Sequence, residues 1–198
     1  MINNALKILD CTLRDGGYYN DWDFSDELVG DYLTAINNSG IDAVEIGFRF
    51  LPKSKFIGSL GYSTDEYLSS LNLPLSCLVG VMINAKEILN FEDGIDEAIS
   101  KLFDEKKNSP VDLVRVAAHF NEYSDCYPIV KALHSLGYIV GFNLMQSGGR
   151  SEKELSDAAA EIKSWKGLEV LYFADSLGNM SKVDVLETID AFRSGGWE

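Results

Sequence analysis

The feature of this sequence that most constrains its fold is a regular alternation of apolar runs with amphipathic segments. Six apolar runs occupy 7–13, 42–48, 75–83, 111–118, 138–145 and 168–174. Several of them are apolar at nearly every position rather than at alternate positions, which is typical of strands covered on both faces in a parallel sheet. The alternation therefore predicts six consecutive strand-then-helix units and the parallel α/β class.

The segments between the runs carry signals for helix ends. Ser63 with Glu66, and Ser151 with Glu154, match the capping box, in which a serine and the acidic residue three positions later each satisfy a backbone amide of the other. Gly40 follows an amphipathic segment and directly precedes the second apolar run. This is the position just after a helix end, where glycine is common. These signals predict helices between the strands.

The length of the chain, taken alone, favours an open doubly wound sheet. A chain of 198 residues without a break in composition indicates one domain. Six units complete an open doubly wound sheet, whereas an eight-stranded (β/α) barrel typically needs about 250 residues. Against the open sheet, the first strand is not followed by GxGxxG, and GxxxxGK[ST] occurs nowhere. Both architectures remain open on these grounds.

Composition argues against several classes of partner. The chain has 31 acidic and 17 basic residues and a net charge of −14, which repels phosphate backbones and anionic membrane surfaces. No apolar run approaches the ~20 residues that a membrane span needs, and no signal-peptide pattern opens the sequence. Three widely spaced cysteines indicate free thiols in a reducing compartment. We therefore expect a cytoplasmic protein with no nucleic-acid or membrane partner.

Polar side chains gather where the predicted strands end. In parallel α/β proteins the carboxyl ends of the strands form the ligand site. The residues at or near these ends are Thr12, Arg14, Asp15, Glu45, Arg49, Asn84, Arg115, His119, Asn121, Asn143, Gln146, Asp175, Ser176 and Asn179. Polar groups at six successive strand ends favour a ligand site over a purely structural role.

Two of these charges stand inside apolar runs. A charge buried in a strand is costly unless it is paired, so Glu45 and Arg115 are expected to have partners, and one option is that they pair with each other. A buried ion pair of this kind can also serve only to tie strands together. The sequence holds no HxH, HExxH or Cys/His cluster, so it does not encode a self-sufficient metal site.

The residues around the first apolar run form a specific motif. LDCTLRDGG at 9–17 resembles the D-x-T-L-R-D-G signature of the metal-dependent aldolase and lyase superfamily. That superfamily includes 4-hydroxy-2-oxovalerate aldolase, hydroxymethylglutaryl-CoA lyase and isopropylmalate synthase. VEIGF at 44–48, ADSLGNM at 174–180 and the order of all six units extend the resemblance over the whole chain. The sequence is most similar to 4-hydroxy-2-oxovalerate aldolase-like proteins.

This resemblance implies a fold, a reaction and partners. The fold is a TIM (β/α)8 barrel, of which residues 1–198 would be the amino-terminal part of a single domain, with about six βα units present. The reaction is divalent-metal-dependent cleavage of a 4-hydroxy-2-oxo acid to pyruvate and an aldehyde through an enolate. An aldehyde dehydrogenase partner is also implied, and the strand edges of a partial barrel are expected to favour self-association.

The resemblance also implies roles for residues of the motif. Asp15 matches a ligand of Mn²⁺ or Mg²⁺, and Arg14 matches the residue that stabilises the enolate. Gly16 and Gly17 are expected to let the chain turn sharply and the substrate approach the backbone. Glu45 is assigned a supporting catalytic role.

A second group of residues is expected to contact the substrate. This group comprises Arg115, Asn143 and Asp175, which stand at the ends of later strands. Their side chains can bind carboxylate, carbonyl and hydroxyl groups of a small 2-oxo acid.

Two departures from the family pattern bear on the mechanism. Where aldolases of this family carry a histidine that serves as general base, this chain has Tyr18, whose phenol is a poorer base at neutral pH. The family's HxH metal ligands on strand seven are not in this sequence, so the metal is expected to be weakly held or absent. The sequence is therefore expected to stop before strand seven.

Two other functions stay open from the sequence. One is an acyl-CoA-dependent condensing enzyme or lyase of the same superfamily. The other is a non-catalytic open sheet that binds a metabolite or a protein, with Arg14 and Asp15 as a structural ion pair.

Overall fold

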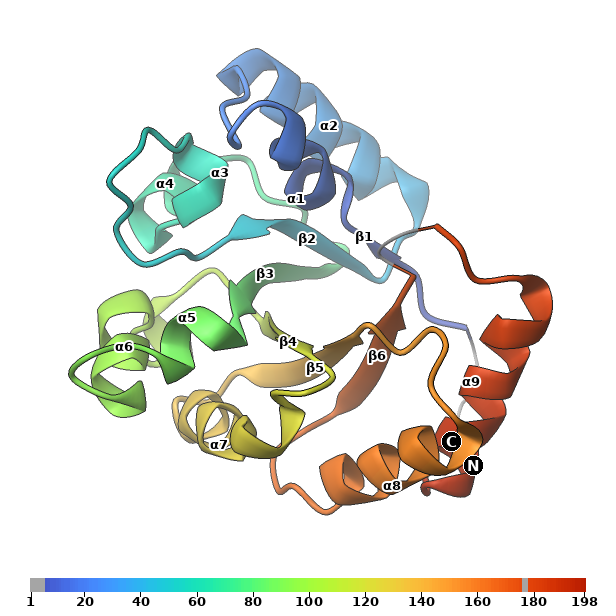
Figure 1. The fold of residues 1–198 in the computed structure, drawn as a ribbon. Coiled ribbons are helices and arrows are strands. Elements are labelled where there is room, and N and C mark those ends of the chain that lie inside the picture. The colour runs from blue at the N-terminus through green and yellow to red at the C-terminus, as the bar shows by residue number, and fades with distance from the viewer. Residues whose placement is uncertain (1–5, 176–177) are drawn as a thin grey trace. The chain divides into compact units, whose positions relative to one another are not determined.

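The computed structural model of the protein describes residues 6–175 and 178–198 (Figure 1). It divides into two compact units. The first unit extends to Ile83 and includes Lys101–Val114, and the second consists of Asn84–Ser100 and Arg115–Glu198. Each unit is built from strands and the helices that follow them.

The first unit begins with three strands that pair in parallel with one another. β1 (Leu9–Asp10) pairs with β2 (Ala43–Phe48), and β2 pairs with β3 (Leu78–Asn84). Its described helices are α1 (Thr12–Gly16), the 3₁₀ turn η1 (Gly17–Tyr19), α2 (Asp26–Ser39), α3 (Ser59–Tyr62), α4 (Asp65–Ser70) and the 3₁₀ turn η2 (Lys106–Asn108). All six residues of β2 are buried, as its continuous apolar run predicts.

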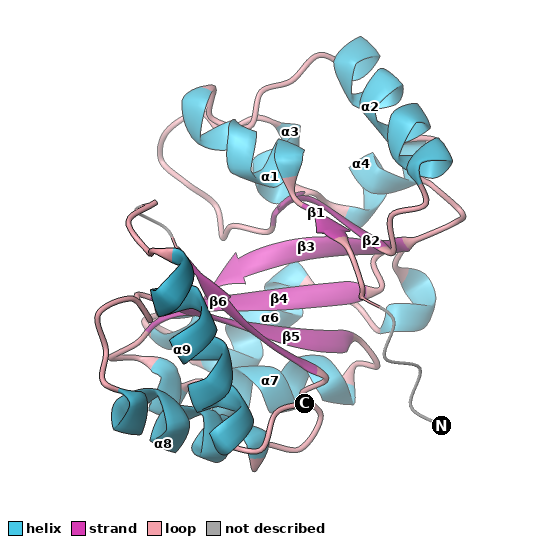
Figure 2. Ribbon diagram, turned by 90° about the vertical axis from the view of Figure 1, so that its right-hand side faces the viewer, coloured by secondary structure: helices cyan, strands magenta, loops and turns pink. Residues whose placement is uncertain are grey.

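The second unit contains most of β4 (Leu113–His119), together with β5 (Ile139–Met145) and β6 (Val170–Ala174). β5 and β6 are parallel. The helices here are α5 (Ala85–Leu89), most of α6 (Ile95–Leu102), η3 (Tyr123–Asp125), α7 (Tyr127–Ser135), α8 (Glu152–Lys163) and α9 (Lys182–Ser194). α8 and α9 lie side by side, as Figure 2 shows.

The order of the strands decides between the two architectures. In the sheet the strands follow one another in chain order, from β1 to β6. A doubly wound sheet reverses its order at a switch point, whereas a (β/α) barrel adds each strand beside the previous one. The sequential order therefore agrees with the barrel class and not with a doubly wound sheet.

The first predicted strand is much shorter than the sequence indicated. The prediction of a strand over 7–13 is wrong beyond Asp10, because Thr12–Gly16 forms a helix. The Asp10 carboxylate accepts the amide of Thr12 at 2.9 Å, and the amide of Asp15 donates to the carbonyl of Cys11 at 2.8 Å. These two bonds turn the chain out of the sheet at once. Apolar character alone could not reveal this turn.

One of the two predicted capping boxes forms. Ser151 makes the reciprocal pair of bonds expected at the start of α8. At the start of α4 the prediction is wrong, because Thr64 is the N-cap and its hydroxyl accepts the amide of Tyr67 at 3.2 Å. Ser63 instead ends α3 and donates its hydroxyl to the carbonyl of Leu60. Among the described residues, no helix is long and apolar enough to cross a membrane.

Candidate active site

Arg14 and Glu45 form a buried ion pair in the first unit. The Nε of Arg14, on α1, donates to Oε1 of Glu45, on β2, at 2.6 Å. The Glu45 side chain is fully buried and that of Arg14 is 12% exposed. A buried carboxylate without a cation would be strongly unfavourable, so the prediction that Glu45 needs a partner is confirmed, and Arg14 is one such partner.

The pair keeps the Arg14 guanidinium charged. Burial alone would lower the pKa of Arg14, but attraction to the Glu45 carboxylate and the hydrogen bond to it outweigh burial and raise that pKa. Nη1 forms a second ion pair with Asp15 at 2.8 Å. Within residues 6–175 and 178–198, Nη2 of Arg14 has no hydrogen-bond acceptor. The guanidinium is thus held by two carboxylates and retains Nη2 as a donor for an anion.

Aromatic side chains surround this guanidinium. The indole Nε1 of Trp22 donates to the backbone carbonyl of Arg14 at 2.8 Å, and Trp22 itself is buried. The Phe48 ring centroid lies 5.3 Å from that of Trp22 and 5.9 Å from Cζ of Arg14. Tyr18 packs edge-on against both rings. Trp22 was not singled out from the sequence, and only its closeness to the motif could have indicated it.

Tyr18 lies against the aromatic cluster and keeps its proton at neutral pH. Its side chain packs on Trp22 and Phe48, yet the residue is 63% exposed. Desolvation by this packing raises the pKa of the phenol, partly opposed by the positive charge of Arg14. The phenol therefore stays protonated at neutral pH and can donate a hydrogen bond.

The two motif glycines are not needed for an unusual backbone conformation. Gly16 and Gly17 have φ of −60° and −61°, ordinary helical values that any residue adopts, so the expectation of a special turn is wrong. Gly17 is required for packing instead. A Cβ there would lie 1.9 Å from Cδ1 of the Trp22 indole. Contact of either glycine with substrate stays a prediction.

The second unit holds a separate polar cluster. Arg115, on β4, is buried, and its Cζ lies 4.3 Å from the ring centroid of Tyr172 on β6. The absence of a side chain at Gly141 leaves room for this stack, because a Cβ there would lie 2.9 Å from the Tyr172 ring. Asn143 is the register partner of Tyr172 and is 5% exposed. Two predicted substrate-binding residues, Arg115 and Asn143, therefore lie on one face of this unit.

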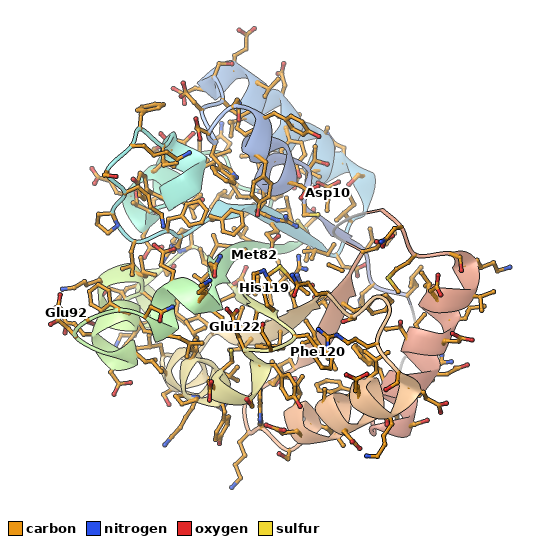
Figure 3. All side chains as sticks on the ribbon, in the orientation of Figure 1. Asp10, Met82, Glu92, His119, Phe120 and Glu122 are labelled. Atoms are coloured by element: carbon orange, nitrogen blue, oxygen red, sulfur yellow. The ribbon has the colours of Figure 1, made fainter. Side chains whose placement is uncertain are left out.

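The remaining strand-end residues of the second unit behave differently from one another. Asp175 is exposed, and its carboxylate accepts the amides of Asn179 and Met180 at 3.0 Å each. Ser176, also predicted at this end, lies outside the described residues. At the end of β4, Nδ1 of His119 lies 3.6 Å from the carboxylate of Glu122, and both residues are labelled in Figure 3.

Other polar residues at strand ends stabilise the fold. Arg49 is buried, forms an ion pair with Asp65 and donates to the carbonyls of Ser63 and Leu102. Asn84 caps α5 through the amide of Lys86. Arg49 and Asn84 thus use their hydrogen bonds within the fold. Position at a strand end does not distinguish such residues from ligand-binding ones.

The described residues do not form a complete metal centre. Among them, no group of three or more His, Cys, Asp or Glu side chains is arranged to hold a metal ion. Asp15 offers an exposed carboxylate, but the Arg14 guanidinium lies 2.8 Å from it. Mn²⁺ and Mg²⁺ take several oxygen ligands in proteins, and a single carboxylate beside a fixed cation does not supply them. The described part of this chain therefore does not make up a metal centre by itself.

Comparison with curated sequences shows which proteins this chain is similar to. No protein-family model matches the chain. A protein of Geobacillus genomosp. 3 named 4-hydroxy-2-oxovalerate aldolase is 26% identical over 197 residues, which are 98% of this chain and 55% of that protein. One of the same name from Carboxydothermus hydrogenoformans is 28% identical over 96% of this chain and 54% of its own length. Both of these relatives carry the name 4-hydroxy-2-oxovalerate aldolase. The resemblance predicted from the motif is confirmed.

These relatives also set the extent of the match. The chain spans about half the length of the curated aldolases it matches. The motif Thr12–Gly16, with Arg14 and Asp15, lies inside the aligned part, because the match covers nearly all of this chain. The first-unit site therefore lies within the part of the chain that aligns with these relatives.

Solved structures support the fold class. The N-terminal domain of a Bacteroides vulgatus protein inferred to be an aldolase matches 93% of this chain and 69% of that domain, with a TM-score of 0.64 and 27% identity. The carboxyl transferase domain of Rhizobium etli pyruvate carboxylase, with pyruvate and biocytin, matches 98% of this chain and 34% of its own, with a TM-score of 0.70. At 16% identity that likeness shows the fold alone. The TIM-barrel class with six βα units is confirmed.

The packing of Gly17 against Trp22 gives the first prediction. Gly17→Ala should lower the free energy of unfolding by about 1–3 kcal/mol, because the new methyl group meets a rigid indole. Gly30→Ala is the matched control: Gly30 lies within α2 and its Cβ would meet nothing within 4 Å. That change should stabilise by about 0.5–1 kcal/mol. Urea unfolding measures both, and equal effects would contradict the packing role of Gly17.

Proposed function

We propose that this chain carries part of the active site of a carbon–carbon lyase. The reaction is cleavage of a 4-hydroxy-2-oxo acid to pyruvate and an aldehyde. The observation that carries the proposal is the Arg14 guanidinium, held by buried Glu45 and with donors remaining for an anion. The names of the curated relatives support the same reaction.

The chemistry explains why a fixed guanidinium is useful. The 4-hydroxyl group loses its proton to water as the bond between C3 and C4 breaks, and its oxygen becomes the carbonyl of the aldehyde. The electron pair of the broken bond passes into the enolate of pyruvate, negative charge collects on the former keto oxygen, and a proton from water then gives pyruvate. A cation already fixed in place stabilises that charge without reorganising. Glu45 fixes Arg14 through Nε and Asp15 engages Nη1, which leaves Nη2 to face the oxygen.

Tyr18 contributes as a neutral donor. Its raised pKa keeps the phenol protonated at neutral pH, so it can donate to an oxygen of the enolate or of the leaving aldehyde. This role differs from that of the histidine general base expected at this position in the family.

Asp15 completes the first-unit set. We assign it as one oxygen ligand of Mn²⁺ or Mg²⁺, an ion that would supply Lewis-acid stabilisation of the 2-oxo acid when bound. Its exposed carboxylate is accessible, whereas the neighbouring guanidinium weakens attraction for a cation. The chain by itself therefore holds the ion weakly.

The wider setting follows from the same proposal. Residues 1–198 belong to a single barrel domain of a cytoplasmic enzyme, with a small 2-oxo acid as substrate. Substrate contact at Gly16 and Gly17 in the first unit, and separately at Arg115, Asn143 and Asp175 in the second, remains a prediction of the sequence. An aldehyde dehydrogenase that takes up the released aldehyde, and self-association through exposed strand edges, remain predictions of the family resemblance.

Arg14 provides the direct test of the proposal. Arg14→Lys keeps the charge but removes the planar fork and the bond from Nε to Glu45, so kcat for pyruvate release should fall roughly 10²–10³-fold. Arg150→Lys, at an exposed arginine of the second unit, should change kcat little. Pyruvate is measured through reduction by lactate dehydrogenase. Pyruvate release by Arg14→Lys at the unaltered rate would refute the proposal.

Tyr18 gives a prediction about pH. A donor works in its protonated form, which persists below a raised pKa, so the ratio of kcat/KM between the unaltered protein and Tyr18→Phe should stay constant from about pH 6 to 9. A base would instead make that ratio rise about tenfold per pH unit below its pKa. Tyr19→Phe, at a neighbour 96% exposed, is the control and should leave kcat/KM unchanged. A rising ratio would exclude the donor role.

Asp15 gives a prediction about metal. Asp15→Asn should weaken binding of Mn²⁺ to this chain roughly tenfold or more, because a carbonyl oxygen replaces a charged ligand. Asp21→Asn is the control, since Asp21 is also an exposed carboxylate next to a cation, Lys55. Electron paramagnetic resonance of free Mn²⁺ gives the dissociation constants. Equal losses for the two variants would show nonspecific attraction to an acidic surface.

A further inference from the structure

The second unit contains a buried hydrogen-bond acceptor without a donor. Asn143 lies on β5, is 5% exposed, and its Oδ1 has no hydrogen-bond partner among the described residues. Buried side-chain carbonyls in native proteins are nearly always bonded, because leaving one unsatisfied costs free energy. An acceptor kept in this state is suited to a donor that arrives with a ligand.

The neighbours of Asn143 belong to one polar and aromatic surface. Asn143 and Tyr172 are register partners in the parallel β5–β6 pair, so their side chains leave the sheet on the same face. The guanidinium of Arg115 lies over the Tyr172 ring at 4.3 Å. Gly141 lies two residues before Asn143, and because it has no side chain, the Tyr172 ring can pack directly against β5. Asn143 therefore stands next to the stack, one step nearer the carboxyl end of β5.

Small side chains follow the stack towards the carboxyl ends of its strands. Two residues beyond Arg115 on β4 is Ala117, and two residues beyond Tyr172 on β6 is Ala174. Because side chains alternate along a strand, these alanines share the face of the stack. This is the edge at which parallel α/β proteins bind ligands.

The chemistry of Oδ1 selects the kind of ligand group. An amide oxygen accepts but cannot donate, so it favours a hydroxyl or N–H group and disfavours a carboxylate or a keto oxygen. A 4-hydroxy-2-oxo acid carries one such donor, its 4-hydroxyl. A site that has a polar group for a substrate hydroxyl discriminates against the analogue that lacks it.

We infer that Asn143 is a specificity-determining residue that accepts a hydrogen bond from the hydroxyl group of a hydroxylated 2-oxo acid bound on this face of the second unit. The identity of the acid as a 2-oxo acid rests on the proposed function, whereas the need for a donor rests on Asn143 itself. Asn143 orients the ligand and takes no proton.

The test compares two ligands that differ by one hydroxyl. Ligand-detected NMR titrations with 4-hydroxy-2-oxovalerate and 2-oxovalerate give both dissociation constants and reveal any pyruvate formed. We expect the protein to prefer the hydroxylated acid roughly five- to tenfold. Asn143→Leu, of similar size, should reduce the preference to about one by weakening only the hydroxylated acid. The same variant should raise the unfolding midpoint of the free protein, since it removes a buried unsatisfied group.

Two further variants make the result decisive. Asn90→Leu replaces an exposed asparagine of the same unit that lies outside the strand-end group, and it should keep the preference. If Asn143→Leu fails to fold, Asn143→Ser, whose oxygen lies nearer the backbone, should show the same loss of preference. An unaltered protein without preference, or an Asn143 variant that retains it, overturns the inference. A preference abolished by the variant without pyruvate formation upholds the inference and counts only against the lyase.

Discussion

The candidate site depends on one buried interaction, the ion pair between Arg14 and Glu45. Glu45 lies in the middle of a strand whose residues are all buried, a place where a carboxylate is tolerated only when it is paired. Its presence there constrains α1 to follow β1 closely enough for Arg14 to reach it. The short β1 and the immediate turn at Asp10 satisfy this requirement. Local chain geometry and site electrostatics are therefore parts of one arrangement.

The aromatic cluster extends this arrangement into the loop after the motif. Trp22 bonds to the carbonyl of Arg14 and fills the space above Gly17. Asp21 and Trp22 both have positive φ, a conformation that non-glycine residues seldom adopt without compensating contacts. The buried indole and its hydrogen bond supply such contacts. The same packing that holds Arg14 in place also desolvates Tyr18, so the donor character of the phenol follows from the packing around the ion pair.

The sequence predicted the class of the fold. Six apolar runs correspond to six strands. The need of Glu45 for a partner was also predicted, but not that Arg14 of the motif would be one. What it missed depends on contacts between segments distant in the chain. Apolar character could not show that Thr12–Gly16 is helical, because a single Asp10 side chain decides it. Nor could position at a strand end separate Arg49, committed to Asp65 and two carbonyls, from residues with donors to spare.

The two units differ in how a buried polar side chain is accommodated. In the first unit the buried group is paired and stabilises the fold, whereas in the second it is unpaired and suited to recognising a ligand. Glu45 is fully buried and charged, and its pairing with Arg14 makes it tolerable in the free protein. Asn143 is nearly as buried but neutral, and its Oδ1 remains unsatisfied among the described residues. A neutral amide can tolerate that state at a far smaller cost in free energy than a carboxylate can. A buried charge without a partner would destabilise the folded protein too strongly, whereas a buried amide without a partner is tolerated until a ligand binds. An amide at this depth can therefore recognise a neutral hydroxyl group, and a carboxylate at the same depth could not.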